Sequence, residues 1–285
     1  MIPTTTYSIP TTANVVLEVT TSLPAAVDLQ PTLLFLHFWG GSSQTFSQLA
    51  EIMTPTHPLV IPSLRGWGKS TGGSPGHYRI VDHAEDIEAL VASHVLRDIG
   101  FFKNGVVLVG HSMGGKIAQL LAVRDNLPAL KRLVLLAPAP LEGFQLPRDM
   151  REQQKSAYNS REAAEFVMRN VLLGPGSKVA SEDKATIDVL VEDCLVGDDG
   201  AKKAWPEYAM EEDYLRMLDS VQLKIPVAVV VGSADVVEPK DNVKRRVVRV
   251  LENAGASVSL RILNDVGHLL PVEAAKDISE VLLAE

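Results

Sequence analysis

Residues 106–122 read VVLVGHSMGGKIAQLLA, in which an apolar run leads to a serine set between glycines and an apolar-striped segment follows. A short run of Val and Leu is typical of a strand buried on both faces, and the segment after it has helical spacing. Ser112 therefore lies on a tight turn from strand to helix. Gly110 and Gly114 flank it at positions where side chains would collide in so sharp a turn.

Two interpretations of Ser112 are open. Serine is a common N-cap, so the residue could simply cap the helix that starts at Met113. A cap does not need glycine on both sides, however. Gly110-His111-Ser112-Met113-Gly114 matches G-x-S-x-G between a strand and a helix, the context in which this motif forms a nucleophile elbow. We therefore predict that Ser112 is a nucleophile.

The rest of the chain alternates between strand-like and helix-like patterns. Further apolar runs predict buried strands at 32–37, 59–62, 132–137, 227–232 and 258–263. Helical patterns cover 44–53, 79–96, 112–124, 239–253 and 271–283. This alternation predicts the α/β class with a mainly parallel sheet. A weaker run, NVVLEV at 14–19, is expected to add an antiparallel entry strand.

The alternation stops between about residues 140 and 217. This part lacks a buried-strand run and contains helical stretches at 160–173 and 181–195, with Ser160 and Ser181 as expected N-caps. We predict a helical cap at 140–217, inserted between two parts of one α/β core at 1–139 and 218–285.

Composition narrows the possible partners. The chain has 285 residues, of which 46% are hydrophobic and 22% charged, and its net charge is −8. A negative chain without a dense basic run disfavours nucleic acid and anionic membranes as partners. Cys194 is the only cysteine, and no signal-peptide pattern opens the sequence, so a cytoplasmic monomer or homodimer acting on a small molecule is expected.

A nucleophilic serine needs a base and an acid that orients the base. His268 follows the last predicted strand in a loop, where catalytic groups are often found. Asp235 lies just after the strand at 227–232, and the chain order Ser112, Asp235, His268 is that of α/β-hydrolases. Glu142, after the preceding strand, is the substitute acid, and Asp265 is nearer to His268 in sequence but lacks a strand-end position.

The developing oxyanion needs N–H donors. The backbone N–H of Met113 at the helix N-terminus is one candidate, and the N–H of Trp39 in HFWGGS, residues 37–42, is the other. His37 is expected to support this loop. The other histidines show neither a catalytic partner nor the spacing of metal ligands; they are His57, His77, His83 and His94.

Several motifs together resemble the α/β-hydrolase superfamily, in particular its capped serine esterase, perhydrolase and C–C hydrolase branch. The matching stretches are HFWGGS (37–42), LRGWGKS (64–70), GHSMGG (110–115), GSADVVEP (232–239) and DVGH (265–268). The resemblance implies an α/β-hydrolase fold with a mostly parallel eight-stranded sheet, a helical cap, acyl-enzyme chemistry, and neither cofactor nor metal.

The sequence departs from the family pattern at two positions. Phe38 stands where a glycine often follows the histidine, and Ser63 stands where an aspartate is common. Serine rather than aspartate at position 112 speaks against epoxide hydrolase and dehalogenase activity.

The expected activity is hydrolysis of a small to medium carboxylic ester or lactone. The alternatives are a C–C bond hydrolase, a perhydrolase or cofactor-free haloperoxidase with the same triad, and a small-molecule receptor with a slow triad. Phe38, His111, Phe144 and Trp205 are the candidate substrate contacts, although His111 is expected to point away from Ser112. Most large apolar residues of the predicted cap are expected to form its own core.

Overall fold

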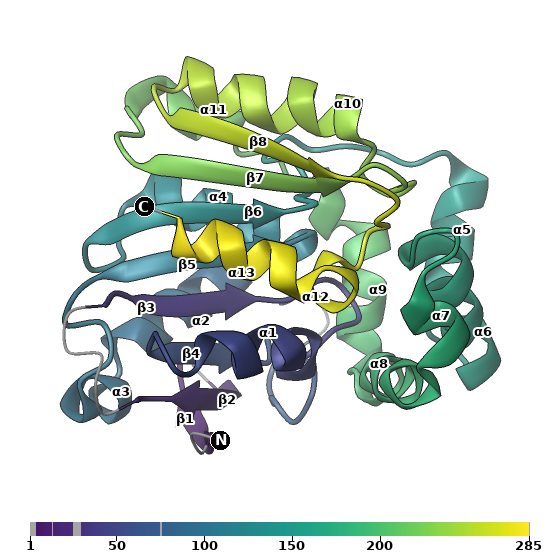
Figure 1. Ribbon diagram of the computed structural model, residues 1–285, viewed down its shortest axis with the longest axis horizontal. Helices are drawn as coiled ribbons and strands as arrows, with labels where there is room; N and C mark the ends of the chain where they lie inside the picture. Colours follow the sequence, from purple (N-terminus) through teal and green to yellow (C-terminus); the bar gives the residue numbers. More distant parts are fainter. Residues whose placement is uncertain (1–3, 13, 25–29, 75, 285) are drawn as a thin grey trace.

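The computed structural model describes residues 4–12, 14–24, 30–74 and 76–284. Its centre is an eight-stranded sheet in the order β1-β2-β4-β3-β5-β6-β7-β8 (Figure 1). The strands are β1 (Thr5–Pro10), β2 (Val16–Ser22), β3 (Thr32–Leu36), β4 (Leu59–Pro62), β5 (Val106–His111), β6 (Leu130–Leu136), β7 (Pro226–Gly232) and β8 (Ser257–Leu263). Strands β4, β3 and β5 to β8 pair in parallel, whereas β2 pairs antiparallel with both β1 and β4.

The predicted fold class is confirmed. The six apolar runs are β3 to β8, and NVVLEV contributes to β2, the antiparallel entry strand. Strand β1 was missed, because TTYSIP is largely exposed and ends in proline, so it has neither a continuous apolar run nor a clear alternation.

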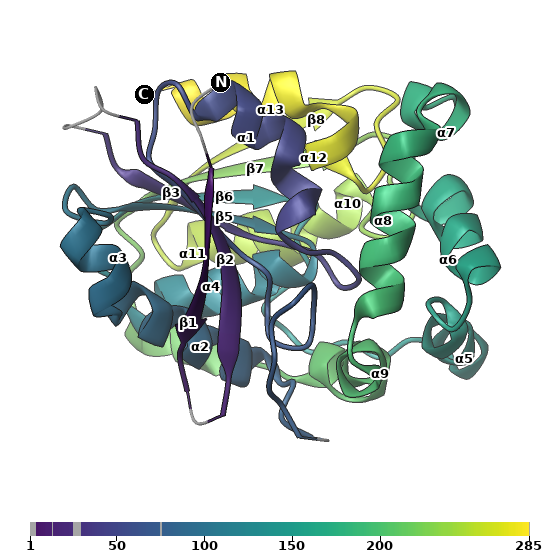
Figure 2. The same cartoon turned by 90° about the horizontal axis from the view of Figure 1, so that it is seen from below.

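Helices cover both faces of the sheet (Figure 2). Residues of α1, α12 and α13 share one apolar cluster with alternate strand residues such as Phe35 and Val109. Residues of α2, α3, α4, α10 and α11 share the other with Leu36 and Leu108. These helices are α1 (Ser47–Met53), α2 (Ile80–Ala92), α3 (His94–Ile99), α4 (Met113–Arg124), α10 (Lys240–Val243), α11 (Arg249–Asn253), α12 (Leu270–Glu273) and α13 (Ala275–Leu283). The central strands are therefore buried on both faces, as their unbroken apolar runs predict.

Two predicted helices are in fact divided. The pattern at 79–96 splits at Ser93, whose ψ of 131° ends α2 and whose side chain accepts a hydrogen bond from the N–H of Val95 to cap α3. The pattern at 271–283 splits at Ala274, where φ is −139°. The spacing of apolar residues does not reveal such breaks, because the helical spacing in the sequence continues across them.

Between β6 and β7 the chain leaves the sheet and forms helices beyond the carboxyl ends of the parallel strands (Figure 1). We call residues 148–220 the helical segment. It contains α5 (Arg148–Ser156), α6 (Arg161–Val167), the π-helix η2 (Met168–Leu172), α7 (Lys178–Glu182), α8 (Lys184–Val196), α9 (Asp199–Glu207) and the short 3₁₀ helices η3 (Ala209–Glu211) and η4 (Leu215–Ser220). The division into a core at 1–139 and 218–285 and a cap at 140–217 stays a prediction; residues 1–3, 13, 25–29, 75 and 285 of those ranges lie outside the described residues.

One of the two expected N-caps is confirmed. The Ser160 side chain accepts a hydrogen bond from the N–H of Ala163 at the start of α6. The prediction for Ser181 is wrong: this residue lies inside α7, and Asp183 caps the next helix by accepting from the N–H of Thr186. Both side chains are good caps, so the choice between them depended on where α7 ends.

The apolar residues of the helical segment divide between core and surface. Tyr158, Met168, Trp205 and Met210 are buried. Met150, Phe166 and Met217 are 52%, 62% and 37% exposed, so they are not part of that core.

Lys116 joins α4 to the chain just before the helical segment and to the last part of that segment. Its side chain is fully buried, and its Nζ donates to the carbonyl oxygens of Glu142 at 3.1 Å, Met210 at 3.2 Å and Glu212 at 2.6 Å. Glu142 precedes the helical segment, whereas Met210 and Glu212 lie near its end. The three carbonyls match the three N–H donors of an ammonium group. Burial lowers the pKa of Lys116 to about 8.

Within the described ranges, no helix has both the length and the apolar character that crossing a bilayer requires.

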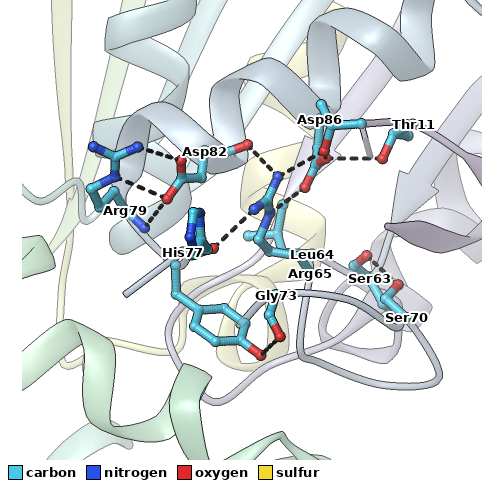
Figure 3. Close-up of polar contacts among 12 residues, drawn as sticks. Thr11, Ser63, Leu64, Arg65, Ser70, Gly73, His77, Arg79, Asp82 and Asp86 are labelled. Carbon is cyan, nitrogen blue, oxygen red and sulfur yellow. Dashed lines mark hydrogen bonds and ion pairs between the residues drawn. The ribbon is translucent and has the colours of Figure 1, made fainter. Parts of the chain in front are cut away.

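A buried arginine fastens the loop between β4 and α2 (Figure 3). The Nε of Arg65 lies 2.5 Å from Oδ2 of Asp86, and its terminal nitrogens donate to the carbonyls of His77 and Asp82 and to the hydroxyl of Thr12. Arg65 is 5% exposed and Asp86 is 1% exposed. The Arg65 guanidinium thus binds α2, the loop itself and the connection between β1 and β2. It therefore holds the loop to both α2 and the β1–β2 connection.

Arg65→Ala is expected to lower the free energy of unfolding by about 3–5 kcal/mol, because it leaves Asp86 as a buried charge without its cationic partner. Urea denaturation followed by circular dichroism measures this loss. Arg261→Ala is the matched control, since Arg261 is paired with Asp277 and Glu280 at a half-exposed site and should cost less than about 1 kcal/mol. If both variants lose the same free energy of unfolding, Arg65 does not stabilise the fold through its buried pair with Asp86.

Candidate active site

Ser112 occupies a backbone conformation that few non-glycine residues adopt. Its φ is 54° and its ψ is −115°, between the end of β5 and the start of α4. Its N–H donates to the carbonyl of Leu136, and its carbonyl accepts from the N–H groups of Gly115, Lys116 and Ala139. The surrounding bonds therefore hold a strained residue in place.

The Ser112 side chain makes no capping hydrogen bond with the described residues. The capping interpretation of this serine is therefore wrong. The hydroxyl remains available at the carboxyl end of β5, with the residue 9% exposed.

The flanking glycines are required by close backbone contacts. A Cβ on Gly110 would lie 2.4 Å from the carbonyl oxygen of Gly114, and a Cβ on Gly114 would lie 2.3 Å from that of Leu36. Gly115 packs in the same way against Pro138. The first turn of α4 thus touches the end of β3, which brings the loop after β3 to the elbow.

His268 and Asp235 form a buried pair. The Nδ1 of His268 lies 2.8 Å from Oδ2 of Asp235, and the other oxygen of this carboxylate accepts from the N–H groups of Val237 and Glu238. A carboxylate can only accept, so Nδ1 carries the proton, and Nε2 of a neutral His268 is left with a lone pair.

The pKa values of the pair move in opposite directions. Burial would raise the pKa of Asp235, but the charge and hydrogen bond of His268 and two backbone N–H groups bring it below its ordinary value. Burial would lower the pKa of His268, but the Asp235 carboxylate outweighs this and raises it above 6.5. Asp235 is therefore ionised near neutral pH, and it stabilises the imidazolium form of His268.

Among the described residues, the other two acids considered for this position bond to partners other than His268. Glu142 forms an ion pair with Arg246. Asp265 has a left-handed backbone, with φ 58°, and its N–H donates to the hydroxyl of Ser233. Of these three acids, the structure brings Asp235 to His268.

His111 links the loop of His268 to the elbow. Its Nε2 donates to the carbonyl oxygen of His268 at 2.8 Å, and its ring centroid lies 5.2 Å from that of His268 and 5.3 Å from that of Phe38. Burial lowers the pKa of His111 to about 3, so the ring is neutral. The buried ring of His111 therefore connects the loop of His268 to the strand that leads to Ser112. The expected substrate contacts of His111 and Phe38 stay predictions.

His37 holds the loop 37–42 in place from the side that faces the core. The parallel pairing of β3 with β5 sets Leu36 beside Gly110, so this loop starts next to the elbow. Nδ1 of His37 donates to the carbonyl of Phe38 at 2.8 Å, and its Nε2 accepts from the N–H of Leu64 at 2.8 Å. Burial lowers the pKa of His37 to about 3 and keeps it neutral. The expected supporting role of His37 agrees with these bonds.

Trp39 and Met113, the predicted oxyanion donors, lie at this junction. Within the described ranges, neither backbone N–H donates to a protein acceptor. Their role in binding an oxyanion stays a prediction.

Phe144 and Trp205 contact each other near Lys116. Their ring centroids are 6.2 Å apart in an edge arrangement, and the Arg246 guanidinium lies 5.0 Å from the Phe144 ring centroid. This places them where the helical segment joins the core. The substrate contacts expected of Phe144 and Trp205 stay predictions.

Two carboxyl groups near His268 were missed by sequence reasoning. Glu238 is 7% exposed, and burial raises its pKa to about 8, with His268 opposing and Asp235 adding to the rise. Glu273 accepts from the N–H groups of Gly174 and Gly267, which joins the helical segment to the loop of His268. Glu238 follows Asp235 by three positions in the same loop, a signal that could have been used. Glu273 gives no local signal.

A sequence model of the alpha/beta hydrolase family matches residues 33–281, which is most of the chain and includes every residue of this site. The chain belongs to the alpha/beta hydrolase family. Lipase 3 of Moraxella sp. (strain TA144) is 26% identical over 258 residues, which are 86% of this chain and 74% of that protein.

Solved structures of other proteins share the fold. A bromoperoxidase from Bacillus anthracis superposes with a TM-score of 0.77 at 16% identity, covering 99% of this chain and 98% of its own. A thermophilic esterase from Thermogutta terrifontis gives 0.73 at 21% identity, covering 98% and 96%. At such identities the likeness shows the architecture and not the reaction.

The pKa of His268 is expected to lie above 6.5 in the wild-type hydrolase and to fall in Asp235→Asn, because burial then acts without the opposing carboxylate. Titration of the imidazole nitrogens by NMR measures both values. His111 and His37 serve as internal references, since their low pKa values keep them neutral from pH 5 to 9. An unchanged pKa of His268 in the variant would show that Asp235 does not control it.

Proposed function

We propose that this alpha/beta hydrolase is a serine-dependent carboxylic ester hydrolase that forms an acyl-enzyme. The observation that carries the proposal is the buried hydrogen bond of 2.8 Å from His268 Nδ1 to Asp235, which leaves Nε2 as the basic atom. It is supported by a serine in an elbow conformation whose hydroxyl caps no helix. Names of relatives such as lipase 3 agree with an ester as substrate.

In the first step, Nε2 of His268 takes the Ser112 hydroxyl proton while Oγ attacks the ester carbonyl carbon. Asp235 remains ionised and stabilises the imidazolium. The carbonyl oxygen becomes an oxyanion, for which the N–H groups of Met113 and Trp39 are the donors. Met113 is at the N-terminus of α4, where the helix dipole also favours negative charge.

In the second step, the imidazolium gives its proton to the leaving alkoxide, and the acyl group stays on Ser112. Water then gives a proton to His268 and attacks the acyl carbon. Collapse of this second tetrahedral species releases the carboxylic acid and returns the proton to Ser112. These reaction steps need no chemical group other than those of the protein, the ester and water.

The proposed substrates are small to medium esters or lactones with an apolar acyl group. Phe38, Trp39 and Met113, in the loop after β3 and at the start of α4, all belong to the main apolar cluster, and an apolar lining beside the carbonyl site suits such a group. No acidic or basic side chain of loop 38–42 adds a charge there.

Ser112→Ala is expected to reduce kcat for a p-nitrophenyl ester by about 10⁴-fold or more, because the nucleophile is lost while binding and the N–H donors remain. Spectrophotometric turnover measures this. A fluorophosphonate should label wild type at Ser112, as mapped by mass spectrometry, and should not label the variant. Wild-type turnover by the variant would contradict the proposal.

A panel of p-nitrophenyl esters of increasing acyl length, assayed together with a vinylogous diketone and peroxide-dependent halogenation, tests the reaction class. Ester turnover is expected to exceed the other two by at least about 100-fold in kcat/KM, about 2.7 kcal/mol in the barrier. Preferred cleavage of the diketone, or preferred peracid formation, would replace ester hydrolysis as the assigned reaction.

A further inference from the structure

The helical segment binds the loop 37–42 directly. The hydroxyl of Tyr158 donates to the carbonyl oxygen of Trp39 at 3.0 Å, and the two rings pack with centroids 4.4 Å apart. The indole Nε1 of Trp39 donates to the carbonyl of Lys202 at 3.0 Å. Trp39 is thus held by two parts of the helical segment, at its backbone and at its side chain.

Helix α8 makes two more contacts with the same loop. The Ser42 hydroxyl donates to Oδ2 of Asp193 at 2.6 Å, and the Cys194 thiol donates to the carbonyl of Gly40 at 3.0 Å. Asp193 is 9% exposed and Cys194 is fully buried. Burial raises the pKa of Asp193 to about 6, so near neutral pH its carboxylate is an acceptor for Ser42.

Gly40 fits tightly under Tyr158. Its φ is +99°, and a Cβ at this position would lie 2.6 Å from the ring and hydroxyl of Tyr158. The loop can therefore approach Tyr158 only with glycine here, and the tyrosine in turn limits the conformations open to the loop.

The contacts fix Trp39 from opposite sides. The Trp39 N–H shares a planar peptide group with the carbonyl of Phe38, which accepts from His37 and from the N–H of Gly41. His37 thus directs this N–H from the core side. The next peptide group, which carries the Trp39 carbonyl, is held by Tyr158 from the helical segment.

We propose that Tyr158 and Asp193 are positioning residues for the oxyanion donor: they hold residues 39–42 so that the Trp39 N–H points to the reacting carbonyl. This inference rests on the proposed function. It makes the helical segment a working part of the alpha/beta hydrolase site, because a segment displaced from the loop would leave the second donor unplaced. Neither residue touches the substrate in this role.

Tyr158→Phe removes the hydroxyl and keeps the ring against Gly40. Asp193→Ala removes the acceptor for Ser42, whereas Asp193→Asn retains a carbonyl oxygen and should rescue. Matched controls are Tyr208→Phe, a tyrosine of the same segment whose hydroxyl accepts from the N–H of Tyr78, and Asp188→Ala, a half-exposed residue of α8 that pairs with Lys184 and Arg161.

Losing an oxyanion donor outright costs about 10²–10³ in kcat, so loosening one is expected to cost on the order of 10-fold in Tyr158→Phe and in Asp193→Ala. KM should stay within about twofold, because the ester binds before the oxyanion forms. The Ki of an alkyl boronic acid, whose adduct on Ser112 mimics the tetrahedral species, should rise by the same factor as kcat/KM falls. Hydrogen exchange of the Trp39–Ser42 amides should become faster in both variants. Asp193→Asn and the two controls should behave as wild type.

The outcomes separate this inference from the proposed function. Ester turnover by wild type that Ser112→Ala abolishes, with Tyr158→Phe and Asp193→Ala unchanged in kcat and Ki, overturns the positioning role alone. A rise in KM without a change in kcat, or faster exchange throughout the helical segment with a lowered Tm, also overturns it, since either indicates general loosening. If the wild-type protein shows no ester turnover that depends on Ser112, both the positioning role and the proposed function are overturned.

Discussion

The tight turn at Ser112 is the constraint on which the rest of the site depends. Its positive φ turns the chain so sharply that α4 begins within one residue of the end of β5. The turn closes because Gly110 and Gly114 lack side chains where carbonyl groups approach to within 2.4 Å of a hypothetical Cβ. The strain is held by four backbone hydrogen bonds to Ser112 and by the apolar packing of α4 against the sheet.

Sheet order then decides what meets at this turn. The chain passes from β3 to β4 on one side and returns to β5 on the other, so the loops after β3 and β5 face each other at a topological switch point. The loops after β7 and β8 arise two and three strands farther along the sheet. His111 bridges that distance by donating to the carbonyl of His268, which ties the loop of His268 to the end of β5.

Three buried histidines carry out different tasks because their partners differ. His37 and His111 donate to carbonyl groups, and burial keeps both neutral. His268 donates instead to a carboxylate, which outweighs burial and raises its pKa. The imidazole ring is thus held neutral at His37 and His111, whereas the charged partner of His268 favours its protonated form, which suits the proton-accepting role proposed for it.

Sequence alone determined the fold class, the elbow, and the chain order of Ser112, Asp235 and His268, since these are written in local patterns of apolar runs, glycines and strand ends. It did not reveal β1, which is an exposed edge strand, or the division of helices at Ser93 and Ala274. Sequence favoured Asp235 over Glu142 and Asp265, but only the tertiary structure set its carboxylate against His268 and brought Tyr158 and Asp193 to the loop of Trp39. These contacts join residues more than thirty positions apart, and no local pattern records a contact that depends on how β-strands and the helical segment pack in space.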